Sequence, residues 1–371
     1  MQRVLLVFGT RPEAVKMAPL VHVLNARADA EVITCVTAQH RQMLDQVLEW
    51  FKITPDHDLN LMQPNQTLAD LSARALQGVS GVIEQAHPDV VLVQGDTTTA
   101  MVTAMAAFYA RIPVGHVEAG LRTYDIYNPF PEEANRRLIS VMASYHFAPT
   151  QTAMDALIAE GTDKRRIYLT GNTVVDALKW TSAQPHPLDL GIPDDGRRLI
   201  LITAHRRESF GAEFANICQA LRQIAERNDD VRLVYPVHLN PNVQQPVREI
   251  LSGVERVHLI APLAYPDFVH LMAKASLVIT DSGGLQEEAP ALGKPVLVMR
   301  RTTERPEAVA AGVAKLVGTD TATIVSAAEM LLRDRAAYDA MANAVSPFGD
   351  GHASERIADI LLGTVKSEYG G

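Results

Sequence analysis

The sequence predicts an α/β protein made of two doubly wound, Rossmann-like domains with a cleft between them. Short apolar runs alternate with segments of helical periodicity along most of the chain, a pattern typical of parallel sheets covered by helices on both faces. The alternation restarts after Gln184–Arg197, a stretch of prolines, glycines and charged residues. A chain of 371 residues is also too long for one ordinary hydrophobic core. These three observations favour two domains of the same class.

The expected strands of the first domain are apolar runs that end at turn residues or at the start of a helix. They are Arg3–Phe8, Glu31–Thr37, Asp89–Gln94, Ile112–Val117, Tyr145–Pro149 and Arg166–Thr170. Helices are expected at Pro12–Ala26, His40–Phe51 and Thr67–Ala86, in the small-residue run from Ala100, and after Pro131 and Thr173. Because the strands are apolar on both sides, both faces of the sheet should be covered.

The second half repeats this alternation. Its expected strands are Leu199–Thr203, Val231–Pro236, Arg256–Ile260, Leu277–Thr280, Pro295–Met299 and a last one near Lys315–Val317. Its expected helices lie near Gly211–Ala225, Pro241–Leu251 and Pro266–Ala273, with further helices to about Leu362. We place the N-terminal Rossmann-like domain at 1–171, the C-terminal Rossmann-like domain at 172–351 and a C-terminal helix at 352–371.

Composition excludes several classes of function. A net charge of −9 gives no electrostatic reason to bind nucleic acid. No apolar run approaches the length of a membrane span, and Met1–Gly9 lacks the features of a signal peptide. Cys35 and Cys218 lie far apart, which argues against a disulfide framework and fits a reducing cytoplasm. We therefore expect a cytoplasmic protein without nucleic-acid or membrane partners.

Charged side chains follow several strands of the first half, at the sheet edge where open parallel sheets bind ligands. Arg11 and Lys16 flank the start of the helix after the first strand, and we favour a ligand role over two solvated cations. Asp96 follows the third expected strand; its plainer role would be to cap the next helix. Glu118 comes directly after a buried strand, where a carboxylate is costly unless it is paired or used.

The helix that begins with PEEANRR carries two acidic and two basic residues. Glu132 and Arg136 are four residues apart, as are Glu133 and Arg137. The plain interpretation is a set of surface ion pairs worth a few tenths of a kcal/mol each. Further along, His205-Arg206-Arg207-Glu208 leaves the first strand of the second half, where basic side chains would suit a diphosphate.

The stretch DSGGLQEEAP joins a buried strand to a helix. Gly283 and Gly284 remove side chains there, so that a ligand can approach the backbone closely. Ser282 adds a hydroxyl, and the helix end suits an anion such as a phosphate. Glu287 and Glu288 follow, and they make more sense as partners of ribose or sugar hydroxyls. The alternative is a serine that only caps a helix and two solvated glutamates.

Two doubly wound domains form a cleft suited to a nucleotide. Neither first strand is followed by a G-x-G-x-x-G fingerprint, and no G-x-x-x-x-G-K-[ST] loop occurs. No spacing of histidine, cysteine and carboxylate residues suggests metal ligands. The nucleotide is therefore expected to be a substrate, with no redox cofactor and no metal.

The motifs GTRPEAVKMAPL, GDTTT, HVEAGLRT, PEEANRR, HRRES and DSGGLQEEAP occur in this order. Together they resemble the non-hydrolysing UDP-N-acetylglucosamine 2-epimerases of bacteria, from Arg3 to about the C-terminal helix. The resemblance implies a GT-B fold whose last helix returns to the first domain and whose second domain binds UDP. It implies reversible conversion of UDP-N-acetylglucosamine (UDP-GlcNAc) to UDP-N-acetylmannosamine (UDP-ManNAc) for surface polysaccharide. Ser209 stands where many relatives have asparagine, and it touches no proposed catalytic group.

The family's functional residues carry over onto matching positions. The resemblance implies that the catalytic residues are Asp96, Glu118, Glu132 and His205. It implies that the residues around UDP and the sugar are Arg11, Lys16, Arg136, Ser282, Gly283, Gly284 and Glu288. In the family UDP is eliminated to leave 2-acetamidoglucal, and its re-addition completes the inversion at carbon 2. Which carboxylate is acid and which is base stays open.

Two further properties are implied by the resemblance. Members commonly form homodimers, and in some bacteria a second molecule of UDP-GlcNAc activates the enzyme. By position only, Gln42, Gln46 and His40 are candidates for that allosteric site. Rival functions are a GT-B glycosyltransferase that uses a UDP-sugar donor, a sugar-nucleotide-binding regulator and a hydrolysing epimerase that releases free N-acetylmannosamine.

Overall fold

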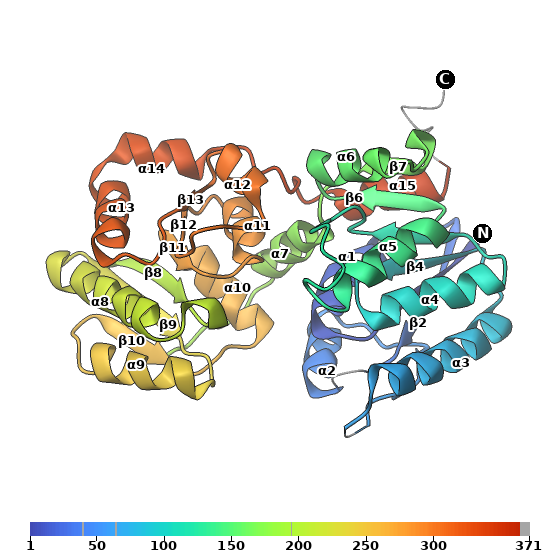
Figure 1. The fold of residues 1–371 in the computed structure, drawn as a ribbon, viewed down its shortest axis with the longest axis horizontal. Coiled ribbons are helices and arrows are strands. Elements are labelled where there is room, and N and C mark those ends of the chain that lie inside the picture. The colour runs from blue at the N-terminus through green and yellow to red at the C-terminus, as the bar shows by residue number, and fades with distance from the viewer. Residues whose placement is uncertain (39–40, 64, 194, 364–371) are drawn as a thin grey trace. The chain divides into compact units, whose positions relative to one another are not determined.

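The computed structural model describes residues 1–38, 41–63, 65–193 and 195–363, the side chains of residues 41 and 42 excepted. The chain forms two compact α/β units (Figure 1). One consists of Met1–Ala177 and the segment that begins at Phe348, and the other is Leu178–Pro347. Each holds one all-parallel sheet, so the predicted class of two Rossmann-like α/β domains is confirmed. Domain boundaries after residues 171 and 351 stay a prediction.

The first unit contains a seven-stranded parallel sheet in the order β3-β2-β1-β4-β5-β6-β7. Its strands are β1 Gln2–Phe8, β2 Ala30–Val36, β3 His57–Asp58, β4 Val90–Gln94, β5 Val114–Val117, β6 Tyr145–Ala148 and β7 Ile167–Leu169. Six of them were expected. The seventh, β3, is only two residues long, too short to show an apolar period in the sequence. The order reverses at β1, which places the topological switch point between β1 and β4.

Helices cover both faces of this sheet (Figure 1). The helices of this unit are α1 Arg11–Asn25, α2 Arg41–Trp50, α3 Leu68–Ala86, α4 Thr98–Tyr109, α5 Glu132–Met142 and α6 Gln151–Ala159, and α7 Thr173–Ala183 begins in this unit and ends in the other. The late helix α15, Ala353–Leu361, packs against α1, and Arg27 forms an ion pair with Asp359 there. The carboxylate of Asp176 accepts the backbone N–H groups of Ala353 and Ser354 at 3.3 and 2.7 Å, so it caps α15.

The second unit contains a six-stranded parallel sheet in the order β10-β9-β8-β11-β12-β13. Its strands are β8 Arg198–Thr203, β9 Val231–Pro236, β10 Val257–Ile260, β11 Leu277–Thr280, β12 Val296–Val298 and β13 Ala314–Leu316. Its helices are α8 Ala212–Arg227, α9 Pro241–Leu251, α10 Tyr265–Lys274, α11 Leu285–Ala291, α12 Pro306–Ala310, α13 Thr321–Arg333 and α14 Arg335–Ala342. The elements again match the expected alternation.

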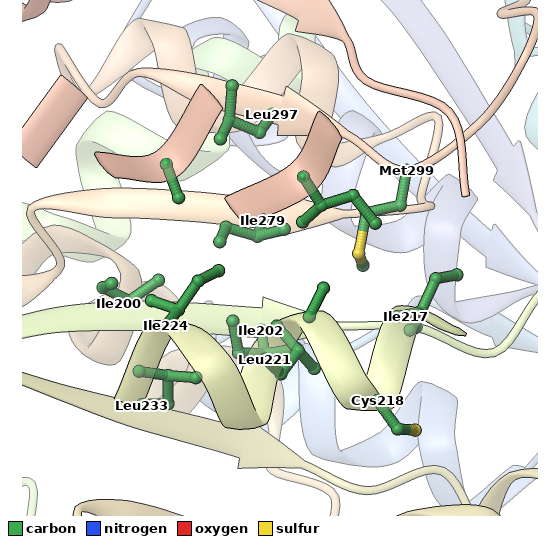
Figure 2. Packing of buried hydrophobic residues seen from close by; sticks show 14 of the residues in the cluster. Ile200, Ile202, Ile217, Cys218, Leu221, Ile224, Leu233, Ile279, Leu297 and Met299 are labelled. Carbon is green, nitrogen blue, oxygen red and sulfur yellow. The ribbon is translucent and has the colours of Figure 1, made fainter. Parts of the chain in front are cut away.

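The core of the second unit fixes the register of the strands that carry functional residues. Ile202 and Ile279 lie on neighbouring strands beneath α8, with Leu221 of that helix packed over them (Figure 2). All three side chains are fully buried. The same register pairs Thr203 with Thr280, the last residues of β8 and β11. The segments that leave these two strands therefore start side by side.

Within the part of the chain that the structure describes, no helix combines the length and the apolar character that crossing a membrane requires.

Candidate functional site

The site in the first unit is built on the carboxyl ends of three adjacent strands. Lys16 lies on the helix after β1, Asp96 follows β4 and Glu118 follows β5. The pairing of Leu6 with Leu92 and of Gln94 with Val117 brings these strand ends to one level. The expected ligand edge of the sheet thus collects side chains that are far apart in the sequence, at the switch point of the fold.

Glu118 is a buried carboxylate with several donors around it. Its side chain is 5% exposed, and Lys16 Nζ lies 2.6 and 2.7 Å from its two oxygens. Asn172 Nδ2 donates to Oε1 at 3.0 Å, and the Gln94 amide donates to Oε2. The backbone of Glu118 has a φ of +65°, a left-handed conformation that is uncommon for residues other than glycine. Such conformations collect at functional sites.

Asp96 is held from the helix α5. Its carboxylate forms an ion pair with Arg136, and Asn135 Nδ2 donates to its backbone carbonyl at 2.9 Å. The alternative role of Asp96 as a helix cap is not found, because Thr97 caps α4 by accepting the N–H of Ala100. The Asp96 carboxylate is therefore not used to cap the helix.

The two neighbouring glutamates at the start of α5 have different environments. Glu133 is fully buried and accepts the backbone N–H groups of Thr123 and Tyr124, and it pairs with Arg136 and Arg137. Glu132 has a buried oxygen, Oε2, without a hydrogen-bond partner among the described residues. Of the two expected pairs four residues apart, Glu133–Arg137 is present, with Glu133 buried instead of at the surface, whereas no Glu132–Arg136 pair is found among the described residues. The contacts of Glu133 stabilise the structure, whereas Glu132 Oε2 makes no such contact to a described residue.

Arg11 stands exposed at the first position of α1. No hydrogen bond or ion pair of its guanidinium to another described residue is found. The helix start beneath it is closed instead by Glu13, whose Oε2 accepts the N–H groups of Gly9 and Thr10 at 3.0 and 2.7 Å. Burial raises the pKa of Glu13, and these hydrogen bonds oppose the rise. The helix end is internally satisfied, so the Arg11 charge is available to an anion.

His116 is a buried residue that sequence reasoning missed. It is fully buried on β5, and its Nε2 lies 2.7 Å from the carbonyl of Gly95, the residue before Asp96. Burial lowers the pKa of His116 to about 4. Its partner across the strand register is His146, also fully buried, whose pKa burial lowers to about 3. No motif marks such a pair, because only the register of two strands brings it together.

In the second unit His205 is positioned by Asp281. The carboxylate of Asp281 is fully buried, and its Oδ2 accepts the backbone N–H groups of His205 and Arg206 at 2.6 and 2.7 Å. Its Oδ1 lies 3.4 Å from His205 Nδ1. The ring of His205 also stacks on His238, with centroids 5.3 Å apart. Desolvation lowers the pKa of His205, Asp281 opposes this effect, and His238 adds to it.

Ser282, Gly283 and Gly284 leave open space at the end of β11. Neither glycine has a positive φ, and a Cβ added at Gly284 would meet nothing closer than 3.9 Å. A Cβ on Gly283 would come no nearer than 3.5 Å to any atom. Neither backbone strain nor internal packing thus requires glycine. The residue that caps α11 is Gly284 and not Ser282, whose hydroxyl forms no hydrogen bond to another described residue.

The two glutamates for which contacts to sugar hydroxyls were expected have different surroundings. Glu287 is buried and forms an ion pair with Arg305. Glu288 is partly exposed, and its Oε1 lies 3.9 Å from the Cβ position of Gly284. Successive residues of a helix point about 100° apart, so only one of the two can face the open space. That residue is Glu288.

Basic side chains near the open end of β11 are largely paired with glutamates. Arg300 is buried and bonds to Glu208 at 2.6 Å and to Glu304 at 2.5 and 3.1 Å. Arg206 lies 3.4 Å from Glu304. The described residues contain no group of three or more histidine, cysteine, aspartate or glutamate side chains placed to hold a metal ion.

These two sites can be compared with known proteins. A family model described as UDP-N-acetylglucosamine 2-epimerase matches residues 22–362. A protein of Escherichia coli K12 named UDP-N-acetylglucosamine 2-epimerase is 56% identical over 368 residues, which cover 97% of this chain and 98% of that protein. The chain belongs to the UDP-N-acetylglucosamine 2-epimerase family. The resemblance stated from the motifs is confirmed.

Solved structures of this epimerase family agree. A Listeria monocytogenes protein assigned as a UDP-N-acetylglucosamine 2-epimerase superposes with a TM-score of 0.94 at 48% identity, covering 99% of this chain and 98% of that chain. The Neisseria meningitidis UDP-GlcNAc 2-epimerase, solved bound to UDP-GlcNAc, has a TM-score of 0.85 at 47% identity. It matches 98% of this chain and all of its own length.

The residues predicted from the epimerase family are divided between the two units. The first unit carries Arg11, Lys16, Asp96, Glu118, Glu132 and Arg136. The second carries His205, Ser282, Gly283, Gly284 and Glu288. For the regulatory prediction, Gln46 is exposed on α2, whereas His40 and the side chain of Gln42 lie outside the described residues.

Proposed function

We propose that this chain is a non-hydrolysing isomerase that interconverts UDP-GlcNAc and UDP-ManNAc. Family membership and the UDP-GlcNAc bound to the Neisseria relative support the substrate. The observation that carries the proposal is the set of carboxylates at one sheet edge. Asp96 and Glu118 follow adjacent strands, and Glu132 has a buried oxygen without a partner among the described residues.

The chemistry explains why several carboxylates are needed. The hydrogen on carbon 2 of the sugar has no neighbouring carbonyl to acidify it, so direct inversion would require an unsupported carbanion. Elimination of UDP with loss of that proton gives 2-acetamidoglucal instead. Re-addition of UDP with protonation of carbon 2 from the other face gives the epimer. One group must take a proton on one face and another must supply one on the opposite face.

We assign the acid and base work to Asp96, Glu118 and Glu132 as a group. Neighbours can move the pKa values of such carboxylates apart, so that one donates while another accepts. Arg136 keeps Asp96 in place, and Lys16 does the same for Glu118. Both cations also place positive charge beside these carboxylates.

His205 serves the reaction in its neutral form. Because its pKa is lowered, it is largely uncharged near pH 7. The proximity of Nδ1 to the Asp281 carboxylate favours a proton on Nδ1, which leaves Nε2 as the basic nitrogen. At the open end of β11, Ser282 donates a hydroxyl to UDP, and Gly283 and Gly284 leave room for its phosphate oxygens. In the first unit, Arg11 offers a positive charge to an anion. Glu288 accepts a ribose or sugar hydroxyl.

We also propose a homodimer formed through the C-terminal ends of α4 and α5. Phe108, Tyr109 and Val141 are exposed there by 57, 67 and 82%. Two grooves adjoin this surface; Arg166 lines both of them, and Asp163 lines one. A surface that carries both signs of charge can pair with its own copy about a twofold axis. We further propose that the protein lies in the cytoplasm and that its product supplies surface polysaccharide. We also propose that UDP-GlcNAc activates the enzyme by binding near Gln46.

Proton NMR of the purified protein with UDP-GlcNAc in deuterated water, without added metal or NAD, tests the function. We expect UDP-ManNAc to appear, with deuterium at carbon 2 of both sugars. Accumulation of free N-acetylmannosamine would indicate a hydrolysing enzyme instead. An unchanged substrate that still raises the thermal midpoint of the protein would indicate a transferase without its acceptor or a binding protein.

A further inference from the structure

Three consecutive residues of the loop after β4 are each held by a different element. The carbonyl of Gly95 accepts from His116 on β5, at 2.7 Å. The carbonyl of Asp96 accepts from Asn135 on α5, at 2.9 Å. The hydroxyl of Thr97 donates to Glu13 on α1, at 2.6 Å. The donor or acceptor side chains, His116, Asn135 and Glu13, are all buried.

The histidine contact has a defined chemical form. A carbonyl oxygen only accepts hydrogen bonds, so the Nε2 of His116 must carry the proton. Its Nδ1 is buried and has no partner among the described residues. Burial lowers the pKa of His116 to about 4, so the ring stays neutral near pH 7. The ring is therefore a permanent single donor aimed at the Gly95 carbonyl.

The Gly95 carbonyl that accepts the hydrogen bond from His116 lies in a tight turn. Gly95 has a φ of +70°, and its backbone N–H donates to the carbonyl of Val117 at 3.0 Å. A Cβ at Gly95 would lie 3.7 Å from Glu118 Oε2. Both polar groups of Gly95 are thus held by β5, right beside the buried Glu118 carboxylate. Rotation of this peptide would displace Asp96, which follows it directly.

We propose that His116 is a positioning residue of the epimerisation, acting with Asn135 and Glu13 to fix the main chain that carries Asp96. The inference rests on the proposed function, because it gives Asp96 acid or base work. His116 does not touch the substrate. It sets the direction from which the Asp96 carboxylate approaches carbon 2, and Arg136 then fixes the end of that side chain. A displacement of a reacting group by about 1 Å costs on the order of 100-fold in rate.

Variants of His116 separate positioning from general packing. His116→Leu fills the space but removes the donor, and we expect kcat to fall by about 30-fold or more. The KM is expected to stay within about twofold, because UDP-binding groups are unchanged. His116→Gln can place an amide N–H near the former Nε2, and it should recover most of the lost rate. This rescue is a readout that a purely structural role would not give.

His146 provides the matched control. It lies beside His116 on the neighbouring strand and is equally buried, but neither of its ring nitrogens has a hydrogen-bond partner among the described residues. His146→Leu therefore removes a buried imidazole without releasing the loop. We expect its kcat to match that of the unmodified protein.

A second variant keeps the test decisive if His116→Leu does not fold, as judged by circular dichroism. Asn135→Asp preserves the shape but replaces the donor to the Asp96 carbonyl with an acceptor, so kcat should fall while KM changes little. Unchanged kcat in a folded His116→Leu protein, or in folded Asn135→Asp where that variant is needed, would overturn the positioning role. Equal losses in His116→Leu and His146→Leu would overturn it too. If the unmodified protein itself shows no turnover, the proposed function fails instead.

Discussion

The ammonium of Lys16 lies 2.6 and 2.7 Å from the two carboxylate oxygens of Glu118. The two residues are 102 positions apart in sequence and meet because β1 and β5 flank β4 in one parallel sheet. Glu118 sits in a left-handed backbone conformation, which costs about 1–3 kcal/mol for a residue other than glycine. A strained, buried carboxylate needs compensation from its surroundings, and Lys16 supplies the positive charge.

Lys16→Met should therefore destabilise the protein as well as weaken UDP binding. Removing one partner of a buried ion pair leaves an uncompensated charge, at a cost of about 3 kcal/mol. Urea unfolding measures the loss. Lys164→Met, at an exposed lysine of the same unit, is the control and should change stability little. Equal stability of the Lys16 and Lys164 variants would show that the ion pair does not stabilise the fold.

Most strands could be predicted because each is a buried apolar run, as Leu277–Thr280 illustrates. Asp96 and Glu118 could be placed at a ligand edge because they directly follow such runs. The helix α6, Gln151–Ala159, was not predicted from the sequence. The contact of Asp281 with His205 could not be predicted, because it depends on β8 and β11, which are distant in sequence and adjacent only in the sheet. The contact of His116 with Gly95 could not be predicted either, because it depends on the register of β4 and β5, which the sequence does not show.

The buried pair of histidines makes the free energy of unfolding depend on pH. The pKa of His146 is about 3 in the fold against an ordinary 6.5. Below pH 6.5 the unfolded chain takes up a proton that the folded chain refuses, so stability falls as the pH falls towards 3. Between pH 7 and pH 5 this residue should account for about 2 kcal/mol of lost stability.

His146→Leu should remove that contribution. We expect the variant to lose less stability than the unmodified protein when urea unfolding is repeated at pH 7 and at pH 5, by about 2 kcal/mol. His116 still titrates in the variant, so part of the acid sensitivity should remain. The same pH dependence in both proteins would mean that His146 is not kept neutral by burial.

The glycine at position 284 should be needed for binding and not for folding. Its φ is −62°, and an added Cβ would lie 3.9 Å from its nearest neighbours, so Gly284→Ala is not strained. The methyl group would instead occupy the space proposed for UDP. We expect an unchanged thermal midpoint and at least about tenfold weaker UDP binding, or about 1.4 kcal/mol, by titration calorimetry.

Gly81→Ala is the matched control for this prediction. Gly81 lies within α3, where a Cβ would meet nothing within 4 Å. Alanine is favoured over glycine inside a helix by about 0.5–1 kcal/mol, so this variant should gain stability and bind UDP normally. If Gly284→Ala bound UDP as well as Gly81→Ala does, the open end of β11 would not be the UDP site.

Glu132 and Glu133 are adjacent, but conversion of each to glutamine should affect a different property. Glu133→Gln should lower stability, and Glu132→Gln should lower kcat. Glu133 is fully buried, accepts two backbone N–H groups and pairs with two arginines. Glu133→Gln weakens these charge-assisted bonds and should cost about 1–3 kcal/mol of stability.

Glu132 Oε2 is buried without a partner among the described residues, so Glu132→Gln should leave stability unchanged. Its proton-transfer role predicts instead a fall in kcat of about 100-fold or more. Deuterium uptake at carbon 2 and thermal unfolding, measured on both variants, test the pair. Normal turnover in Glu132→Gln would remove Glu132 from the catalytic group, whereas a lower thermal midpoint in that variant would show that the side chain supports the fold.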